Sequence, residues 1–224
     1  MIVAIIQARM NSSRLPNKTL IDISGKPMLQ RVIDRVSRAA LVDRVVVATS
    51  GMADDEPIQR MVASENLFMG SKNDVLDRVY KAAIKHDAHI VVRITGDCPL
   101  IDWNIINGVV HYFLLTEVDY VTNRPLFDSY PDGMDVEVMT IEALKRVWKE
   151  ATSSYDREHV TSYIRNHPEL FKIGEMTYDA DLSHIKVSVD TQEDLEIVRR
   201  IYRDLGEYAE LAGIVFWWEH YRNG

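Results

Sequence analysis

The chain has 224 residues, of which 46% are hydrophobic and 27% charged, and its formal net charge is -8. This composition is typical of a globular protein with a sizeable core, and the acidic balance disfavours nucleic acid as a partner. No apolar run approaches the roughly 18 residues of a membrane span, so we expect no membrane partner either. The single cysteine, Cys98, excludes an intramolecular disulfide, and the apolar start at residues 1–7 is too short for a signal peptide. We therefore expect a cytoplasmic protein.

The first half of the chain alternates between strand-like and helix-like segments. Apolar, β-branched runs without alternation are typical of buried parallel strands, and they occur at residues 2–6, 44–48, 90–94 and 120–121. Helical spacing of apolar residues lies between or after them, at residues 27–40, 57–66, 74–86 and 103–116. This alternation predicts an α/β fold with a mostly parallel sheet and right-handed crossovers.

The rhythm changes after Arg124. A turn signal at residues 130–133 precedes segments that predict, in order, a half-exposed strand at 135–139, helices at 141–151 and 157–166, and a strand at 171–178. We interpret residues 124–184 as an insertion within a single domain that spans residues 1–224.

The C-terminal part predicts one more strand and helix. The expected strand covers residues 185–189, and the helix after it starts with a capping box formed by Thr191 and Asp194. The aromatic residues 216–218 predict either a packing tail or an oligomer contact.

A basic loop follows the first predicted strand. Residues 7–18 contain Arg9, Arg14 and Lys18 among small polar residues, and they match neither a Walker A motif nor a dinucleotide fingerprint. Ligands of open α/β sheets bind at the carboxyl ends of the strands, so these cations can face a polyanion together. The alternative is a solvated basic loop with no ligand.

Two aspartates also follow predicted strands. Asp97 comes after the strand at 90–94, next to Gly96, and Asp190 comes after the strand at 185–189. Two carboxylates that meet at one sheet edge can share Mg²⁺, which takes one or two carboxylates together with phosphate oxygens and water. The alternatives are an Asx-turn at Asp97 and a helix cap at Asp190.

These residues belong to strings that resemble the sugar cytidylyltransferases, which include the CMP-Kdo and CMP-sialate synthetases. The opening string runs from residue 5 to residue 28, and the chain looks nearest to the SpsF-type branch of spore-coat polysaccharide biosynthesis. Further matching strings are VRITGDCPLID at 92–102, YPDGMDVE at 130–137, REHVT at 157–161 and VDTQEDL at 189–195. The resemblance extends to about Tyr202.

The resemblance implies a three-layer α/β/α sandwich of the nucleotide-diphospho-sugar-transferase type. It also implies a catalytic set of Arg9, Lys18, Asp97 and Asp190, in which the two aspartates hold Mg²⁺. The CTP-binding residues that it implies are Ala8, Arg9, Ser13, Arg14, Lys18, Thr95 and Gly96. The expected assembly is a homodimer formed through the inserted segment.

The expected reaction joins CMP from CTP to a sugar or sugar acid and releases pyrophosphate, in surface polysaccharide or glycoconjugate biosynthesis. Thr95 and Cys98 stand where the Kdo enzymes have a glutamine and an acidic residue, which leaves the acceptor open. Polar residues of the insertion are the expected acceptor-binding set: Asp132, Asp135, Glu137, Arg157, Glu158 and His159.

Two other functions remain open from the sequence. One is a glycosyltransferase that uses a nucleotide-sugar donor, although the Asp-x-Asp string at 179–181 follows no clear core strand. The other is a nucleotide-binding protein without turnover. The acceptor candidates also have a structural alternative, because Arg157 and Glu158 fit the first turn of a helix and a lone histidine in a helix is commonly structural.

Overall fold

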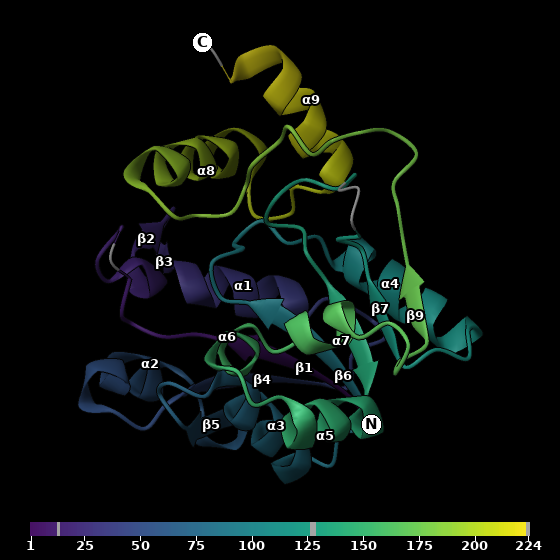
Figure 1. Ribbon diagram of the computed structural model, residues 1–224. Coiled ribbons are helices and arrows are strands. Elements are labelled where there is room, and N and C mark those ends of the chain that lie inside the picture. The colour runs from purple at the N-terminus through teal and green to yellow at the C-terminus, as the bar shows by residue number, and fades with distance from the viewer. Residues whose placement is uncertain (13, 126–128, 223–224) are drawn as a thin grey trace.

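The computed structural model describes residues 1–12, 14–125 and 129–222 (Figure 1). The strands in these residues are β1 (Ile2–Gln7), β2 (Asp22–Ile23), β3 (Lys26–Pro27), β4 (Arg44–Ser50), β5 (Leu67–Gly70), β6 (Ile90–Thr95), β7 (Tyr120–Thr122), β8 (Glu137–Thr140) and β9 (Ile173–Glu175). The α-helices are α1 (Met28–Val36), α2 (Glu56–Met61), α3 (Val75–Lys85), α4 (Trp103–Leu115), α5 (Ile141–Glu150), α6 (Ser154–His159), α7 (Ser162–Asn166), α8 (Gln192–Leu205) and α9 (Leu211–Tyr221).

One mixed sheet of seven strands forms the centre of the described chain, in the order β5-β4-β1-β6-β8-β7-β9. Neighbouring strands from β5 to β6 are parallel, as are β7 and β9. Only β8 runs antiparallel to its neighbours β6 and β7 among these strands. The predicted mostly parallel α/β sheet is therefore confirmed.

Helices cover both faces of the sheet. Ala4 and Ile6 of β1 pack into one apolar cluster together with residues of α1, α4, α8 and α9. Val3 and Ile5 pack into a second cluster with residues of α3 and α5, because successive side chains of a strand point to opposite faces. Figure 1 shows α3 and α5 on the side of the sheet opposite to α8 and α9. The arrangement is the expected three-layer sandwich.

The predicted strand at residues 185–189 is wrong. This stretch of the described chain forms a single bridge, between Asp132 and Lys186, and no strand. The amides of Val187 and Ser188 both donate to the Asp132 carbonyl, and the amide of Val189 donates to the Asp97 carbonyl at 2.9 Å. The segment therefore bonds to the loop after β6 and to the turn near Asp132, where no neighbouring strand continues a ladder.

Three further elements differ from expectation. β8 lies inside the sheet, and its residues Glu137, Val138 and Met139 are buried, so the strand is not half-exposed. The helix expected at 157–166 is two helices, α6 and α7, which are interrupted after His159. Strand β5 was not anticipated, since a four-residue edge strand carries little periodicity.

The aromatic tail belongs to α9. Trp217 and Trp218 are buried against the core cluster that includes Tyr202 of α8, whereas Phe216 is exposed. The structure thus assigns a packing role to the tail. Among the described residues, no helix has both the length and the apolar character needed to cross a bilayer.

Candidate active site

A cleft of about 690 Å³ lies at the carboxyl ends of β1, β4 and β6. This is the edge at which open α/β sheets bind ligands. Members of the expected site set that line it are Ala8, Arg9, Arg14, Lys18, Thr95, Gly96, Asp97, Glu158, His159 and Asp190. Ser13, which was also expected there, lies outside the described residues.

Turn chemistry shapes the basic loop. Asn17 takes a left-handed conformation with a φ of 59°, which asparagine tolerates better than most residues, and the amide of Lys18 donates to the Leu15 carbonyl. The Thr19 hydroxyl then donates to the Arg9 carbonyl at 2.6 Å and ties the two ends of the loop together. The loop therefore closes on itself beside the cleft.

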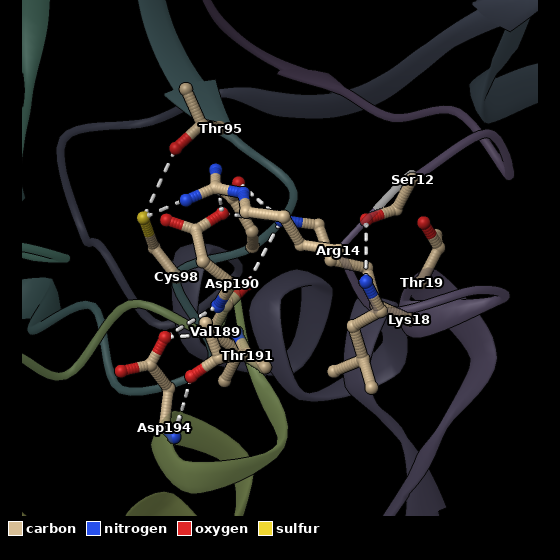
Figure 2. Close-up of polar contacts among 12 residues, drawn as sticks. Ser12, Arg14, Lys18, Thr19, Thr95, Cys98, Val189, Asp190, Thr191 and Asp194 are labelled. Carbon is tan, nitrogen blue, oxygen red and sulfur yellow. Dashed lines mark hydrogen bonds and ion pairs between the residues drawn. The ribbon is translucent and has the colours of Figure 1, made fainter.

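Lys18 connects the loop with both aspartates. Its Nζ donates to Asp97 Oδ2 at 3.0 Å, to Asp190 Oδ1 at 3.0 Å and to the Val189 carbonyl at 2.9 Å. The Lys18 side chain is only 14% exposed. Figure 2 shows Lys18 and Arg14 converging on Asp190. The structure thus brings together two aspartates that are 93 residues apart in the chain.

The other cations of the loop are paired as well. Arg14 Nη2 lies 2.9 Å from Asp190 Oδ1, and Arg9 Nη2 lies 3.3 Å from Glu158 Oε1 of α6. Both arginines are about half exposed or more, so these pairs face water. Exposed ion pairs contribute at most about 1 kcal/mol each, and an incoming anion can replace them.

The pKa values of the central pair favour its charged form. Burial would raise the pKa of Asp97, but the Lys18 ammonium and the Thr95 hydroxyl outweigh burial and hold the pKa below its ordinary value. Burial would likewise lower the pKa of Lys18, but Asp97 and Asp190 raise it above its ordinary value. Both groups are therefore ionised at neutral pH.

Gly96 permits a close approach between the two central strands. A Cβ atom at this position would lie 2.9 Å from the Gln7 carbonyl oxygen and 3.2 Å from the Ala8 Cβ. The Gly96 amide donates to that same carbonyl at 3.0 Å. Any larger residue would push the Asp97 loop away from the basic loop. Cys98, next to it, is buried, and burial raises the pKa of its thiol well above the ordinary value, which leaves it a poor nucleophile.

The two aspartates fit a divalent cation. Their carboxylates share the Lys18 ammonium, and Asp190 also contacts Arg14 and, at 3.7 Å, Lys186. Both remain open to the cleft, with 33% of the Asp97 side chain and 22% of the Asp190 side chain exposed. Mg²⁺ binds such hard oxygen ligands and completes its coordination with phosphate oxygens and water. No group of three or more metal-binding side chains occurs in the part of the chain that the structure describes. The remaining ligands would therefore come from substrate and water.

The expected acceptor residues separate into four groups. Glu158 and His159, at the end of α6, line the cleft. Arg157 turns the other way, where its guanidinium contacts Asp74 at 2.5 Å and the Trp148 carbonyl at 2.7 Å. Its described contacts thus connect α6 with the start of α3 and with α5.

The other two groups lie off the cleft. Glu137 is buried in the sheet with 6% exposure. Asp132 and Asp135 lie 3.7 and 2.7 Å from Arg124, and neither is among the residues that line the cleft. Burial raises the pKa of Asp135 to about 6, although Arg124 opposes the rise.

The cleft is also lined by residues that the sequence did not indicate. They include Ser50, Asp54, Lys72, Asn73 and Arg78. The nearest signal was the N-cap at Asp74, which does begin α3 but says nothing about where the preceding residues fold. Asp55 accepts hydrogen bonds from the amides of Met10 and Ser50 and so fixes this wall to the basic loop.

Comparison with known proteins gives the same picture as the geometry. A family model described as cytidylyltransferase matches residues 3–216. The spore coat polysaccharide biosynthesis protein SpsF of Bacillus subtilis is 30% identical over 222 residues, covering 94% of this chain and 90% of that protein. The 3-deoxy-manno-octulosonate cytidylyltransferase of Sodalis glossinidius is 30% identical over 210 residues, covering 89% and 83%.

A solved structure is similar over almost the entire length. A cytidylyltransferase from Leptospira borgpetersenii matches with a TM-score of 0.91 at 30% identity, covering 97% of this chain and 93% of that one. The resemblance read from the sequence is confirmed, and the chain belongs to the cytidylyltransferase family.

Proposed function

We propose that this protein is a sugar cytidylyltransferase that joins CMP from CTP to a sugar or sugar acid and releases pyrophosphate, in polysaccharide or glycoconjugate biosynthesis. The convergence of Asp97 and Asp190 on Lys18, inside a cleft bordered by Arg9 and Arg14, carries the proposal. Cations beside paired carboxylates suit a triphosphate that brings a divalent cation. SpsF of Bacillus subtilis is named for spore coat polysaccharide biosynthesis, which supports the pathway class.

The reaction is an in-line displacement at the α-phosphorus. A hydroxyl of the sugar forms a bond to the α-phosphorus while the bond to the oxygen bridging the α- and β-phosphorus breaks, and pyrophosphate leaves with that oxygen. Arg9, Arg14 and Lys18 orient the triphosphate and stabilise the charge that grows on the departing pyrophosphate. His159, at the cleft wall, is our candidate for accepting the hydroxyl proton.

We propose Mg²⁺ as the metal, held by Asp97 and Asp190. When bound, it would neutralise phosphate charge and polarise the α-phosphate. Near neutral pH the Asp97 carboxylate can serve as a ligand, since Lys18 already keeps its pKa low without the metal. We also propose that the protein is a cytoplasmic homodimer that needs neither nucleic acid nor a membrane.

The acceptor is a sugar or sugar acid that lies against α6. Glu158 and His159 are the described α6 side chains that line the cleft, and they differ in charge. A carboxylate of the acceptor would favour His159 and would compete with Glu158 for Arg9, whereas an amino group would favour Glu158. The acceptor class is therefore open to a direct test.

The test measures pyrophosphate release by the purified protein with each of the four nucleoside triphosphates. Each is incubated with Mg²⁺ or EDTA and with a panel of sugar acids, amino sugars and sugar phosphates. We expect release with CTP alone, only with Mg²⁺, and only with one class of acceptor. Absence of CTP binding by calorimetry, together with silence across the panel, would overturn the proposal.

A further inference from the structure

A buried carboxylate connects the cleft wall with the middle of the sheet. Glu137 of β8 accepts hydrogen bonds at Oε1 from the Tyr120 hydroxyl at 2.5 Å and from the Thr161 hydroxyl at 2.6 Å. Its Oε2 contacts Arg93 of β6. Three segments that are distant in sequence therefore meet at one buried side chain.

Arg93 extends these contacts to the cleft. Its Nε donates to Gln7 Oε1 at 3.0 Å, and Gln7 lines the cleft at the end of β1. Burial would raise the pKa of Glu137, but Arg93, Thr161 and Tyr120 outweigh it and hold the pKa below the ordinary value. The charge is thus kept inside the sheet at a desolvation cost that apolar packing would avoid.

Thr161 lies beside a strained turn. Val160 has a φ of 59° and a ψ of -60°, and the Thr161 amide donates to the His159 carbonyl at 2.6 Å. These values describe a γ-turn with a positive central φ, which is rare and strained. For a β-branched residue such a φ is a genuine outlier, and it persists only where the surroundings fix it.

The surroundings of this turn are the buried network. Val160 is 1% exposed and packs in the cluster that contains Tyr120 and Ile164, and Thr161 is bonded to Glu137. The sequence pattern predicts one helix through residues 157–166, so the interruption opposes the local preference. The turn lies between α6, which carries Glu158 and His159, and α7, so it sets the angle at which the two helices join.

We propose that Glu137 is a positioning residue that holds, through Thr161, the turn at Val160 and so keeps α6 in place as a wall of the substrate cleft. The inference rests on the proposed function for its kinetic consequence. Its structural consequence, the ordering of residues 154–161, is independent of turnover. Arg157 fixes the same helix to Asp74 on its other side, so α6 is anchored at two points.

The test compares two variants that remove one hydrogen bond from the same oxygen atom. Thr161→Val removes the bond to the α6 turn, and Tyr120→Phe removes the bond from β7 and leaves the turn untouched. Each should lower the melting temperature by about 2–4 °C, because each deletes one buried hydrogen bond. Only Thr161→Val should reduce kcat/KM, by roughly 10- to 100-fold, since it alone misplaces the cleft wall. Thr161→Ser keeps the hydroxyl and should restore the rate.

Hydrogen exchange supplies the second readout. Amides of residues 154–161 should exchange roughly 10-fold faster in Thr161→Val than in wild type, and at the wild-type rate in Tyr120→Phe. Equal exchange in the two variants, or equal losses of kcat/KM, would overturn the positioning role. If the wild type released no pyrophosphate, the proposed function would fail while the exchange comparison would still decide the role of Glu137.

Discussion

Removing the Lys18 ammonium deprives Asp97 of its ion pair, whereas Asp190 keeps its contacts with Arg14 and Lys186. Breaking a fully buried ion pair costs about 3–5 kcal/mol, and breaking an exposed pair costs at most about 1 kcal/mol. Lys18 is 14% exposed and its two partners are 33% and 22% exposed, so the site is intermediate. We expect Lys18→Met to lower the free energy of unfolding by about 2 kcal/mol, which corresponds to roughly 4–8 °C in melting temperature for a chain of this size.

The same variant reports on the metal. With Lys18 removed, Mg²⁺ no longer competes with the ammonium for Asp97 and Asp190, so added Mg²⁺ should raise the melting temperature of the variant more than that of wild type. Differential scanning fluorimetry with and without Mg²⁺ measures both effects, and Arg60→Met, which removes an exposed helix pair with Glu56, is the control. The pKa of Lys18 is raised above 10.5, so its contribution is lost only as pH rises beyond that, and the lowered pKa of Asp97 confines the acid loss to pH below 3.8. A variant that has the same melting temperature as wild type, or that gains no more stability from Mg²⁺ than wild type does, would refute this account of the site.

Two other substitutions test separate parts of the molecule. Asp97→Asn should reduce turnover by roughly 100- to 1000-fold with an unchanged circular dichroism spectrum. The control is Asp181→Asn, at an exposed aspartate that does not line the cleft, and it should retain full activity. Wild-type turnover in Asp97→Asn would contradict the metal assignment. Burial, with smaller contributions from Asp132 and Glu137, raises the pKa of Asp135 from 3.8 to about 6. Between these two pH values the folded protein retains a proton that the unfolded chain loses. The free energy of unfolding should therefore fall by about 3 kcal/mol as pH rises from about 4 to about 6. Urea titrations at pH 4 and pH 7 should show this loss in wild type and its absence in Asp135→Asn. If wild type and variant differed in free energy of unfolding by the same amount at both pH values, the prediction would be contradicted.

The core of the site could be predicted because it depends on a general property of parallel sheets. Loops that follow β1 and β6 meet at one edge, so Lys18 and Asp97 were expected near each other and are. Asp190 reaches the same place although the strand predicted before it does not form. Its position depends on the hydrogen bond between the Val189 amide and the Asp97 carbonyl, a long-range contact that no local pattern contains.

Glu137 shows why the rest of the predicted site, the acceptor-binding residues, could not be predicted from the sequence. Alternation at residues 135–139 favoured a half-exposed strand with both acidic side chains available to a ligand. In the structure β8 is inserted antiparallel between β6 and β7, and Glu137 stands opposite Arg93 in the register. The charge is acceptable inside the sheet because Arg93, from a strand 44 residues earlier, pairs with it, and because the Tyr120 and Thr161 hydroxyls donate to it. Strand order, which local periodicity does not encode, thus decides whether a polar residue lies in the site or beneath it.

The described cleft also predicts how nucleotide and metal bind together. Arg9, Arg14 and Lys18 each contact a carboxylate that lines the cleft. A triphosphate without a divalent cation would draw these cations away, so that Asp97 loses its ion pair with Lys18 and Asp190 keeps its 3.7 Å contact with Lys186. A divalent cation alone would compete with Lys18 for the same oxygens. Binding of the triphosphate therefore removes the competition that the metal meets from Lys18, and binding of the metal supplies the positive charge that the aspartates lose to the triphosphate.

We expect this coupling to amount to roughly 5- to 150-fold in affinity, and to be reciprocal as thermodynamic linkage requires. Titration calorimetry of CTP with and without Mg²⁺, and of Mg²⁺ with and without CTP, measures both sides of the cycle. In Lys18→Met the metal no longer competes with the ammonium, so Mg²⁺ alone should bind more tightly and the coupling should shrink. Independent binding of the two ligands to wild type would show that the ion pairs of the free cleft are not exchanged on binding.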